Sequence, residues 1–124
     1  MRHVYLTLAE TVEIHKQLIE EFGGSHGIRD QTGLEAAIFR PQVGYYGNII
    51  QEAAALMESL ANNHAFIDGN KRTALLTMYT FLGINGVDFI VPEADAAAMI
   101  MSLAAGEVSE ESLARWIRDN WPKT

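Results

Sequence analysis

The sequence predicts a single all-α domain spanning residues 1–124. Apolar residues recur at the three- and four-residue spacing of helices through most of the chain. Capping residues and prolines stand where these stretches begin, and glycines stand where several of them end. With 124 residues, 48% hydrophobic content and no internal repeat, the chain is long enough to enclose its own hydrophobic core.

The first predicted helix begins after Thr7 and ends at Phe22. Thr7 and Glu10 have the spacing of a capping box, and two glycines follow the helix. Its predicted buried stripe consists of Leu8, Val12, His15, Ile19 and Phe22. His15 is the polar member of this stripe. We interpret it as a histidine satisfied within the core, with a residue lining a cleft as the alternative.

Two more helices precede the central part of the chain. Thr32 and Glu35 resemble a second capping box, and Pro41 is expected to stop the helix that they begin. The third helix is marked by Ile49, Ala53, Leu56 and Leu60. The polar, glycine-rich segment 24–32 is expected to be a loop.

A fourth helix is predicted after Gly69, with an apolar face formed by Leu75, Met78, Tyr79 and Leu82, and it should end between Gly83 and Gly86. Residues 87–91 are interpreted as a short strand or an extended link. Two helices complete the chain, from Pro92 to about Ala105 and from Ser109 to about Trp121. The large apolar residues of this region are assigned to the core, with a partner-binding surface as the alternative: Met99, Ile100, Met101, Leu103, Trp116 and Trp121.

The segment from His64 to Thr73 carries the strongest functional signal. Gly69, Asn70 and Lys71 should form the first turn of the fourth helix, where backbone N–H groups lack helical partners and the helix dipole is positive. Lys71 and Arg72 add positive charge there, at an unfavourable cost of about 0.3–1 kcal/mol each against the dipole. This arrangement predicts a binding site for phosphate groups.

The residues before this turn have the chemistry of phosphoryl transfer. Asp68 is predicted to hold Mg²⁺ together with substrate phosphates, with helix capping as a second role. His64 is predicted to take the proton from an attacking hydroxyl. A tight loop should send Phe66 into the core and leave His64 and Asp68 facing the cleft.

These residues resemble the Fic/Doc superfamily. The motif of that family begins with histidine, phenylalanine, an acidic residue, glycine and asparagine, matched here by His64, Phe66, Asp68, Gly69 and Asn70. Lys71 replaces a glycine and Leu75 replaces an arginine of the adenylylating branch, and both changes resemble the Doc (death-on-curing) toxins. The flanks also resemble Doc over nearly the whole chain, at residues 20–24, 27–30 and 40–42.

The resemblance implies a compact helical fold with a central motif helix and a flap, and a toxin that acts as a protein kinase. ATP and Mg²⁺ would be used to phosphorylate a threonine of a translation factor, elongation factor Tu, and a cognate antitoxin would restrain the toxin. Gly27, Ile28 and Arg29 would belong to a flap that holds the target segment. The alternatives are transfer of AMP to a protein hydroxyl and a noncatalytic partner of the antitoxin.

The composition indicates which ligands and which cellular compartment to expect for this protein. The net charge of −7 argues against direct binding of nucleic acid, because phosphate backbones are bound by basic patches. The absence of cysteine is consistent with a reducing compartment. We expect a cytoplasmic protein without a membrane span, because the apolar runs are too short for one and the N-terminus lacks an apolar signal region.

Overall fold

The computed structural model describes residues 3–123 and confirms the all-α class. In chain order its elements are α1 (Leu8–Phe22), α2 (Gln31–Phe39), the short 3₁₀ helix η1 (Arg40–Gln42), α3 (Ile49–Asn62), α4 (Asn70–Ile84), α5 (Glu93–Ala104) and α6 (Glu110–Asp119). The part of the chain that the structure describes contains no strand, only one isolated bridge between two loops. None of its helices has the length and apolar character that crossing a bilayer requires.

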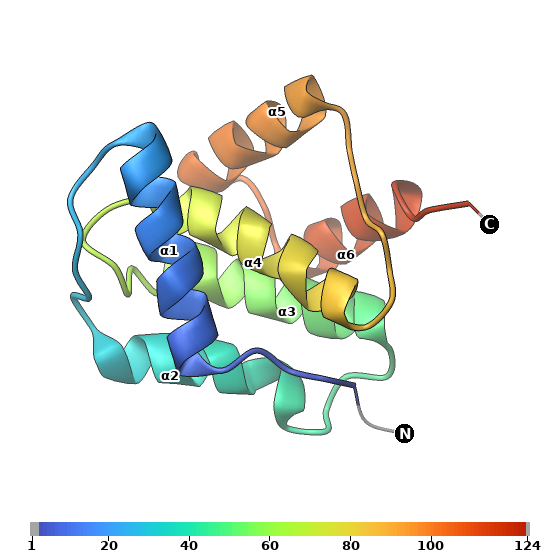
Figure 1. Ribbon diagram of the computed structural model, residues 1–124. Helices are drawn as coiled ribbons and strands as arrows, with labels where there is room; N and C mark the ends of the chain where they lie inside the picture. Colours follow the sequence, from blue (N-terminus) through green and yellow to red (C-terminus); the bar gives the residue numbers. More distant parts are fainter. Residues whose placement is uncertain (1–2, 124) are drawn as a thin grey trace.

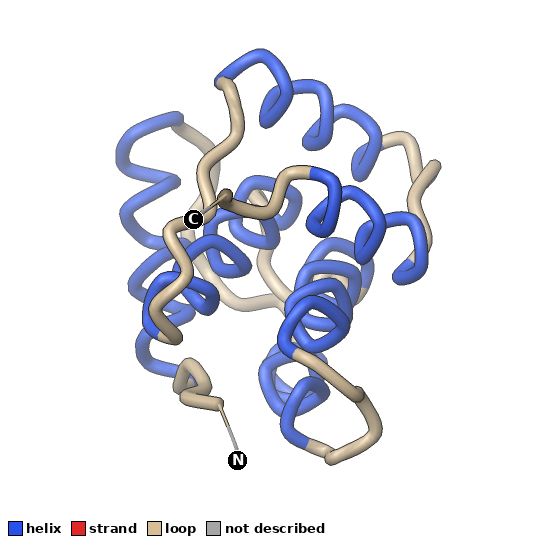
Figure 2. Tube along the Cα trace, turned by 90° about the vertical axis from the view of Figure 1, so that its right-hand side faces the viewer, coloured by secondary structure: helices blue, strands red, loops and turns tan. Residues whose placement is uncertain are grey.

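Helices α3 and α4 form the centre of the molecule and pack against each other (Figures 1 and 2). α3 is buried on more than one face: nine of its fourteen residues are buried, many of them alanines that allow neighbouring helices to approach closely. α1 and α5 pack on α4, whereas α2 and α6 pack on α3. The central pair therefore needs apolar residues around most of its circumference, which explains why its sequence is so rich in them.

The start of α1 agrees with the predicted capping box. The Thr7 side chain accepts a hydrogen bond from the Glu10 N–H, and the Glu10 side chain accepts one from the Thr7 N–H. These two bonds satisfy donors that the first turn of a helix leaves without partners.

The predicted start of the second helix is wrong by two residues. Asp30, rather than Thr32, caps α2, and its carboxylate accepts a hydrogen bond of 2.9 Å from the Gly33 N–H. The Asp30 N–H itself donates to the Ala65 carbonyl. The helix therefore begins directly after the hydrogen bond between Asp30 and Ala65. Because Ala65 is far away in the sequence, a local sequence pattern does not reveal this contact. The α-helix does end before Pro41, as predicted, and continues as the 3₁₀ turn η1.

Residues 87–91 form the extended link rather than a strand. Phe89 and Val91 of this link are buried. The Phe89 ring packs against Trp116 and Trp121, with centroid distances of 5.9 and 6.4 Å, and both tryptophans are partly buried against the core. α6 ends at Asp119, two residues before Trp121.

Two residues assigned to the core are exposed. Met101 is 72% exposed on the outer side of α5, while Met99 and Leu103 take the buried positions of that helix. Phe22 is 54% exposed at the end of α1, although Leu18 and Ile19 before it are buried. Its ring contacts the Arg72 guanidinium instead of the core.

Candidate active site at the motif loop

The loop that joins α3 to α4, residues 63–69 and hereafter the motif loop, separates its side chains as predicted. Phe66 is 2% exposed, whereas His64 and Asp68 are exposed. The backbone of His64 is left-handed, with φ +51°, which helps the chain to turn sharply after α3. The Asn70 side chain closes the turn: its carbonyl accepts from the Phe66 N–H and its amide donates to the Phe66 carbonyl, at 3.0 and 2.9 Å.

The first turn of α4 has the free donors that the phosphate prediction requires. Gly69 is the N-cap, with φ +76°, and no side chain caps the helix. Within the described residues, the N–H groups of 69–72 have no hydrogen-bond acceptor. These donors lie at the positive end of the α4 dipole, so an anion bound there would replace the missing cap.

Asp68 does not cap α4, so the capping role predicted for it is wrong. One oxygen of its carboxylate accepts a hydrogen bond of 3.1 Å from the Ser25 N–H, in the loop between α1 and α2. Its main-chain carbonyl accepts from His15, which is 3% exposed. His15 therefore lies beneath the motif loop as a satisfied buried histidine and does not line a cleft. Burial lowers the pKa of His15 and favours its neutral form.

The two basic residues of the first turn point to different places. The Lys71 ammonium donates to the Ala61 carbonyl at the end of α3, which the negative end of the α3 dipole favours. Burial lowers the pKa of Lys71. Arg72 is exposed, and its guanidinium lies over the Phe22 ring, 4.6 Å from the centroid. In this conformation Arg72 is the more accessible of the two charges, whereas the predicted phosphate contact of Lys71 requires its ammonium to leave Ala61.

The segment predicted as a flap lies against the motif loop. Ile28 and Phe66 form an antiparallel bridge, flanked by hydrogen bonds from the Arg29 N–H to the Ala65 carbonyl and from the Ile67 N–H to the Gly27 carbonyl, at 2.7 and 3.1 Å. In Figure 1 the two loops lie side by side at the left of the molecule, away from both chain ends. In this type of bridge the N–H and C=O of Ile28 point away from the motif loop, and they have no partner within the described residues.

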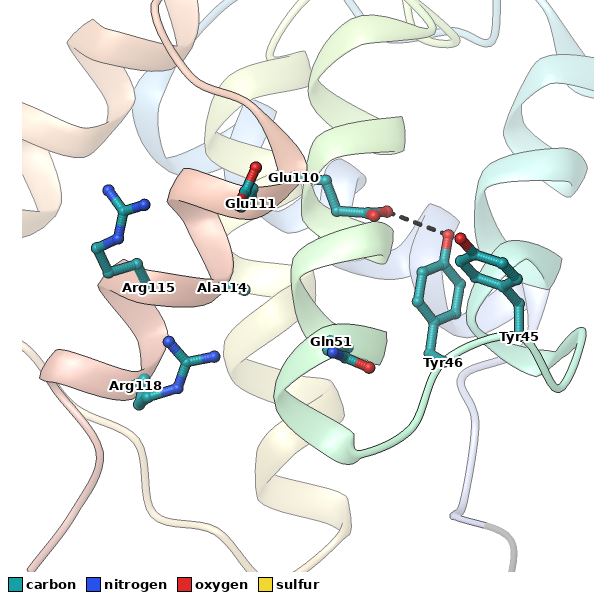
Figure 3. Close-up of a pocket in the computed structure, with 8 residues that line it drawn as sticks. All are labelled: Tyr45, Tyr46, Gln51, Glu110, Glu111, Ala114, Arg115 and Arg118. Carbon is teal, nitrogen blue, oxygen red and sulfur yellow. Dashed lines mark hydrogen bonds between the residues drawn. The ribbon is translucent and has the colours of Figure 1, made fainter.

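Neither of two cavities in the described part of the chain is lined by His64 or Asp68, which the sequence predicted to face a cleft. One cavity, of about 490 Å³, lies between α6 and the loop that precedes α3; Figure 3 shows its lining residues. It contains none of the predicted site residues. A second cavity, of about 260 Å³, lies between α1, α4 and α5 and reaches the site through Arg72. Its lining is mainly apolar: Leu18, Glu21, Phe22, Arg72, Leu75, Leu76, Tyr79 and Ile100.

The donor set at the motif loop suits a nucleotide with Mg²⁺ better than a resident metal ion. No cluster of three or more metal-binding side chains occurs within residues 3–123. Mg²⁺ bound with a nucleotide needs only one or two carboxylates, and the second oxygen of Asp68 has no hydrogen-bond partner within the described part of the chain. The unpaired N–H groups of α4 could donate hydrogen bonds to phosphate oxygens placed beside them.

Two further residues contribute to the site without having been predicted to do so from the sequence. Ser25 holds Asp68 through its main-chain N–H, which leaves no signature in the identity of residue 25. Ile19 lies against Gly69, and its Cδ1 would be 3.1 Å from a Cβ placed there. The helical stripe had already predicted that Ile19 is buried, but it did not show which segment lies above it.

Comparison with known proteins agrees with this geometry. A family model described as the Fic/DOC family matches residues 5–82. "Protein kinase doc" of Escherichia phage P1 is 34% identical over 122 residues, which cover 95% of this chain and 94% of that protein. "Toxin Doc" of Mycolicibacterium smegmatis (strain ATCC 700084 / mc(2)155) is 49% identical over 83 residues, covering 60% of this chain and 64% of that protein. The match to the second relative therefore spans less than two thirds of its length.

Proposed function

This chain belongs to the Fic/Doc family, within its Doc branch, and from that premise we propose that it is a toxin that acts as a protein kinase. It transfers the γ-phosphate of ATP to a threonine hydroxyl of a translation factor, elongation factor Tu, and so arrests translation. The observation that carries this proposal is the folding of the motif loop. Phe66 anchors the loop in the core while His64, Asp68 and the free N–H groups of α4 remain accessible.

In the proposed reaction, the target hydroxyl oxygen forms a bond to the γ-phosphorus, the bond to the β-phosphate oxygen breaks, and ADP leaves. The His64 imidazole takes the hydroxyl proton. The N–H groups of Gly69 and Asn70, with Arg72, stabilise the charge on the phosphate oxygens, and Lys71 joins them once its ammonium has left the Ala61 carbonyl. Asp68 would hold Mg²⁺ through its carboxylate, and the bound ion would supply neutralisation of charge on the phosphates.

Lys71 supports phosphate transfer over AMP transfer. Its side chain extends from the first turn of α4 to the end of α3, so it fills space that a glycine would leave to the nucleotide. The phosphate chain must then run differently from that in a site with glycine at this position. We therefore assign the γ-phosphate, and not the α-phosphate, to the position next to His64.

The flap and a nearby groove supply the proposed protein contacts. The outward N–H and C=O of Ile28 can pair with an extended target segment, which would add a strand next to Gly27, Ile28 and Arg29. A cognate antitoxin is the second proposed partner, since one relative is named a Doc toxin. The apolar cavity beside Arg72 is suited to a helical antitoxin segment.

Intact-mass analysis tests the reaction. Purified elongation factor Tu is incubated with this protein, ATP and Mg²⁺, and a mass increase of one phosphoryl group is expected. His64→Ala should reduce the rate at least about 100-fold, because a positioned general base contributes about 10²–10⁴. An increase of one AMP would replace the kinase proposal with AMP transfer, and an unmodified target would refute the assignment of this substrate. A His64→Ala variant that reacts as fast as the parent would remove the base assignment.

A further inference from the structure

His15 lies directly under the peptide bond that joins Asp68 to Gly69. Its Nε2 is 2.8 Å from the Asp68 carbonyl oxygen, and the residue is 3% exposed. A carbonyl oxygen only accepts hydrogen bonds, so Nε2 must carry a proton and act as the donor. A residue of α1 thus holds the main chain of the motif loop across 53 positions of sequence.

This hydrogen bond fixes the direction of a second group. A trans peptide is planar, so its C=O and N–H point in opposite directions. Because the Asp68 carbonyl points inward to His15, the Gly69 N–H points outward. Within the described residues that N–H has no acceptor, and it stands at the positive end of α4.

The local backbone does not secure this orientation by itself. Gly69 has φ +76°, but glycine adopts positive and negative φ with similar ease, so the 68–69 peptide can rotate at little steric cost. A rotated peptide would present the carbonyl oxygen, which is the negative end of the peptide dipole, to an arriving phosphate. A fixed partner for the carbonyl is therefore needed to keep the donor outward.

The His15 ring is itself held in place by the motif loop. It stacks on the Phe66 ring, with centroids 3.8 Å apart and an interplanar angle of 6°. Ile19, one helical turn further along α1, completes the surface on which Gly69 rests. The ring plane, and with it the direction of the Nε2–H bond, is thus set by stacking on Phe66.

We propose that His15 is a positioning residue of the phosphate site, holding the Asp68–Gly69 peptide so that the Gly69 N–H faces the bound phosphate. This inference rests on the proposed function, since the phosphate is that of ATP. It assigns to a buried residue of α1 a share in nucleotide binding that acts entirely through the peptide above it.

Two substitutions separate the hydrogen bond from the packing. His15→Phe keeps an aromatic ring against Phe66 but removes the donor. His15→Gln loses the ring but carries an amide N–H that reaches about as far as Nε2. Thr11→Val is the matched control, because Thr11 is fully buried one turn earlier on the same face of α1 and bonds only to the Thr7 carbonyl.

The affinity for ATP with Mg²⁺ is measured by calorimetry. His15→Phe should weaken it about ten-fold, the equivalent of one hydrogen bond, and His15→Gln should restore it to within about three-fold of the parent. Thr11→Val should leave it unchanged. If His15→Phe and His15→Gln lose the same affinity, or if Thr11→Val loses as much as His15→Phe, His15 has only a structural role and the proposal is overturned. Parent-like affinity in His15→Phe would also overturn it.

NMR gives a readout that needs no nucleotide. In the parent, the ¹⁵N spectrum should place the ring proton of His15 on Nε2, and the Asp68 carbonyl ¹³C resonance should shift in His15→Phe and return in His15→Gln. A ring with an unprotonated Nε2, or an unshifted carbonyl in His15→Phe, overturns the proposal. If the parent binds no ATP, the proposed function fails on its own, and these spectra decide the orientation of the peptide separately.

Discussion

At the scale of single residues, Gly69 shows how one backbone angle links the fold to the site. Its φ of +76° lies in the left-handed region, and a Cβ at this position would come within 3.1 Å of Ile19 Cδ1. Any side chain would therefore add both backbone strain and crowding against α1. The same residue carries the outward N–H of the phosphate site, so glycine here meets a structural and a functional requirement together.

Gly69→Ala should lower the free energy of unfolding by about 1–2 kcal/mol, because alanine disfavours this φ. Gly83→Ala is the matched control in the same helix: nothing lies within 4 Å of its added Cβ, and its φ is not positive. That change should raise the free energy of unfolding by about 0.5–1 kcal/mol. Urea denaturation of both variants checks the pair, and equal effects at the two positions would contradict the argument.

The buried His15 should also make stability depend on pH. Burial lowers its folded pKa below the ordinary value of 6.5, so between these two values the unfolded chain binds more protons than the folded one. The stabilisation that the neutral, buried His15 gives to the folded protein is fully present above pH 6.5. It is lost as the pH falls from 6.5 through the folded pKa of His15. The stability difference between the parent and His15→Gln should therefore shrink between about pH 7 and about pH 5.

Denaturant unfolding at a series of pH values measures this difference. Thr11→Val should shift stability by a similar amount at each pH, because threonine does not titrate. A parent and a His15→Gln variant with parallel pH profiles would show that His15 keeps its ordinary pKa in the folded protein.

At the scale of elements, Arg40 joins three parts of the chain. It extends from η1 and donates to Glu58 and Ser59 of α3, to Glu110 of α6 and to the Tyr46 hydroxyl, at distances between 2.5 and 2.8 Å. The planar guanidinium suits this role because its donors diverge in fixed directions. The Arg40 network therefore fixes the position of α6 against α3 and borders the large cavity of Figure 3, through Tyr46 and Glu110.

Arg40→Met should destabilise the protein by about 1–3 kcal/mol, since it leaves two partly buried carboxylates without their cation. Arg115→Met serves as the control: Arg115 is exposed on α6 and makes no ion pair within the described residues, so a change below about 0.5 kcal/mol is expected. Thermal and urea unfolding compare the two variants. Arg40→Lys should also fall short of the parent, because one ammonium cannot reproduce the fork.

At the scale of the whole molecule, an acidic protein is proposed to bind an acidic ligand. The net charge is −7, yet the first turn of α4 combines free N–H groups with Lys71 and Arg72. These N–H donors and the two basic side chains therefore have to outweigh the repulsion between the negatively charged protein and a triphosphate. Mg²⁺ reduces that repulsion, which is why the proposed ligand is ATP with Mg²⁺ and not ATP alone.

Ligand binding should raise the stability of the whole chain, since ATP with Mg²⁺ would bind the folded state only. At a concentration of 100 times the dissociation constant the gain is about 2.7 kcal/mol, which calorimetric melting curves detect readily. ATP with a chelator should give a smaller gain, and Asp68→Asn should reduce the dependence on Mg²⁺. A melting temperature that is unchanged by ATP and Mg²⁺ at millimolar concentrations would contradict the proposed site.

The sequence by itself determined the helical class, the placement of most helices and the composition of the site. Periodic apolar residues, the Thr7–Glu10 capping box and the glycine before α4 act within one or two turns of chain, so their effects can be read locally. The inward turn of Phe66 was predicted from the need to bury an aromatic ring: alternation in an extended chain would place Phe66 on the same side as His64 and Asp68, so a tight loop was expected. Phe22 and Met101 were misplaced because periodicity shows the face of a helix but not how far its neighbours extend.

Only the tertiary structure decided which distant groups hold the motif loop. The contacts of Asp68 with Ser25 and His15, the capping of α2 by Asp30 and the turn of Lys71 to Ala61 all depend on how α1, α3 and the two loops meet. Each of these hydrogen bonds joins a side chain to a main-chain group, and every residue carries the same main-chain carbonyl. Side-chain identities therefore specify the chemistry of the site, whereas the packing of α1 beneath it specifies the direction in which its donors point.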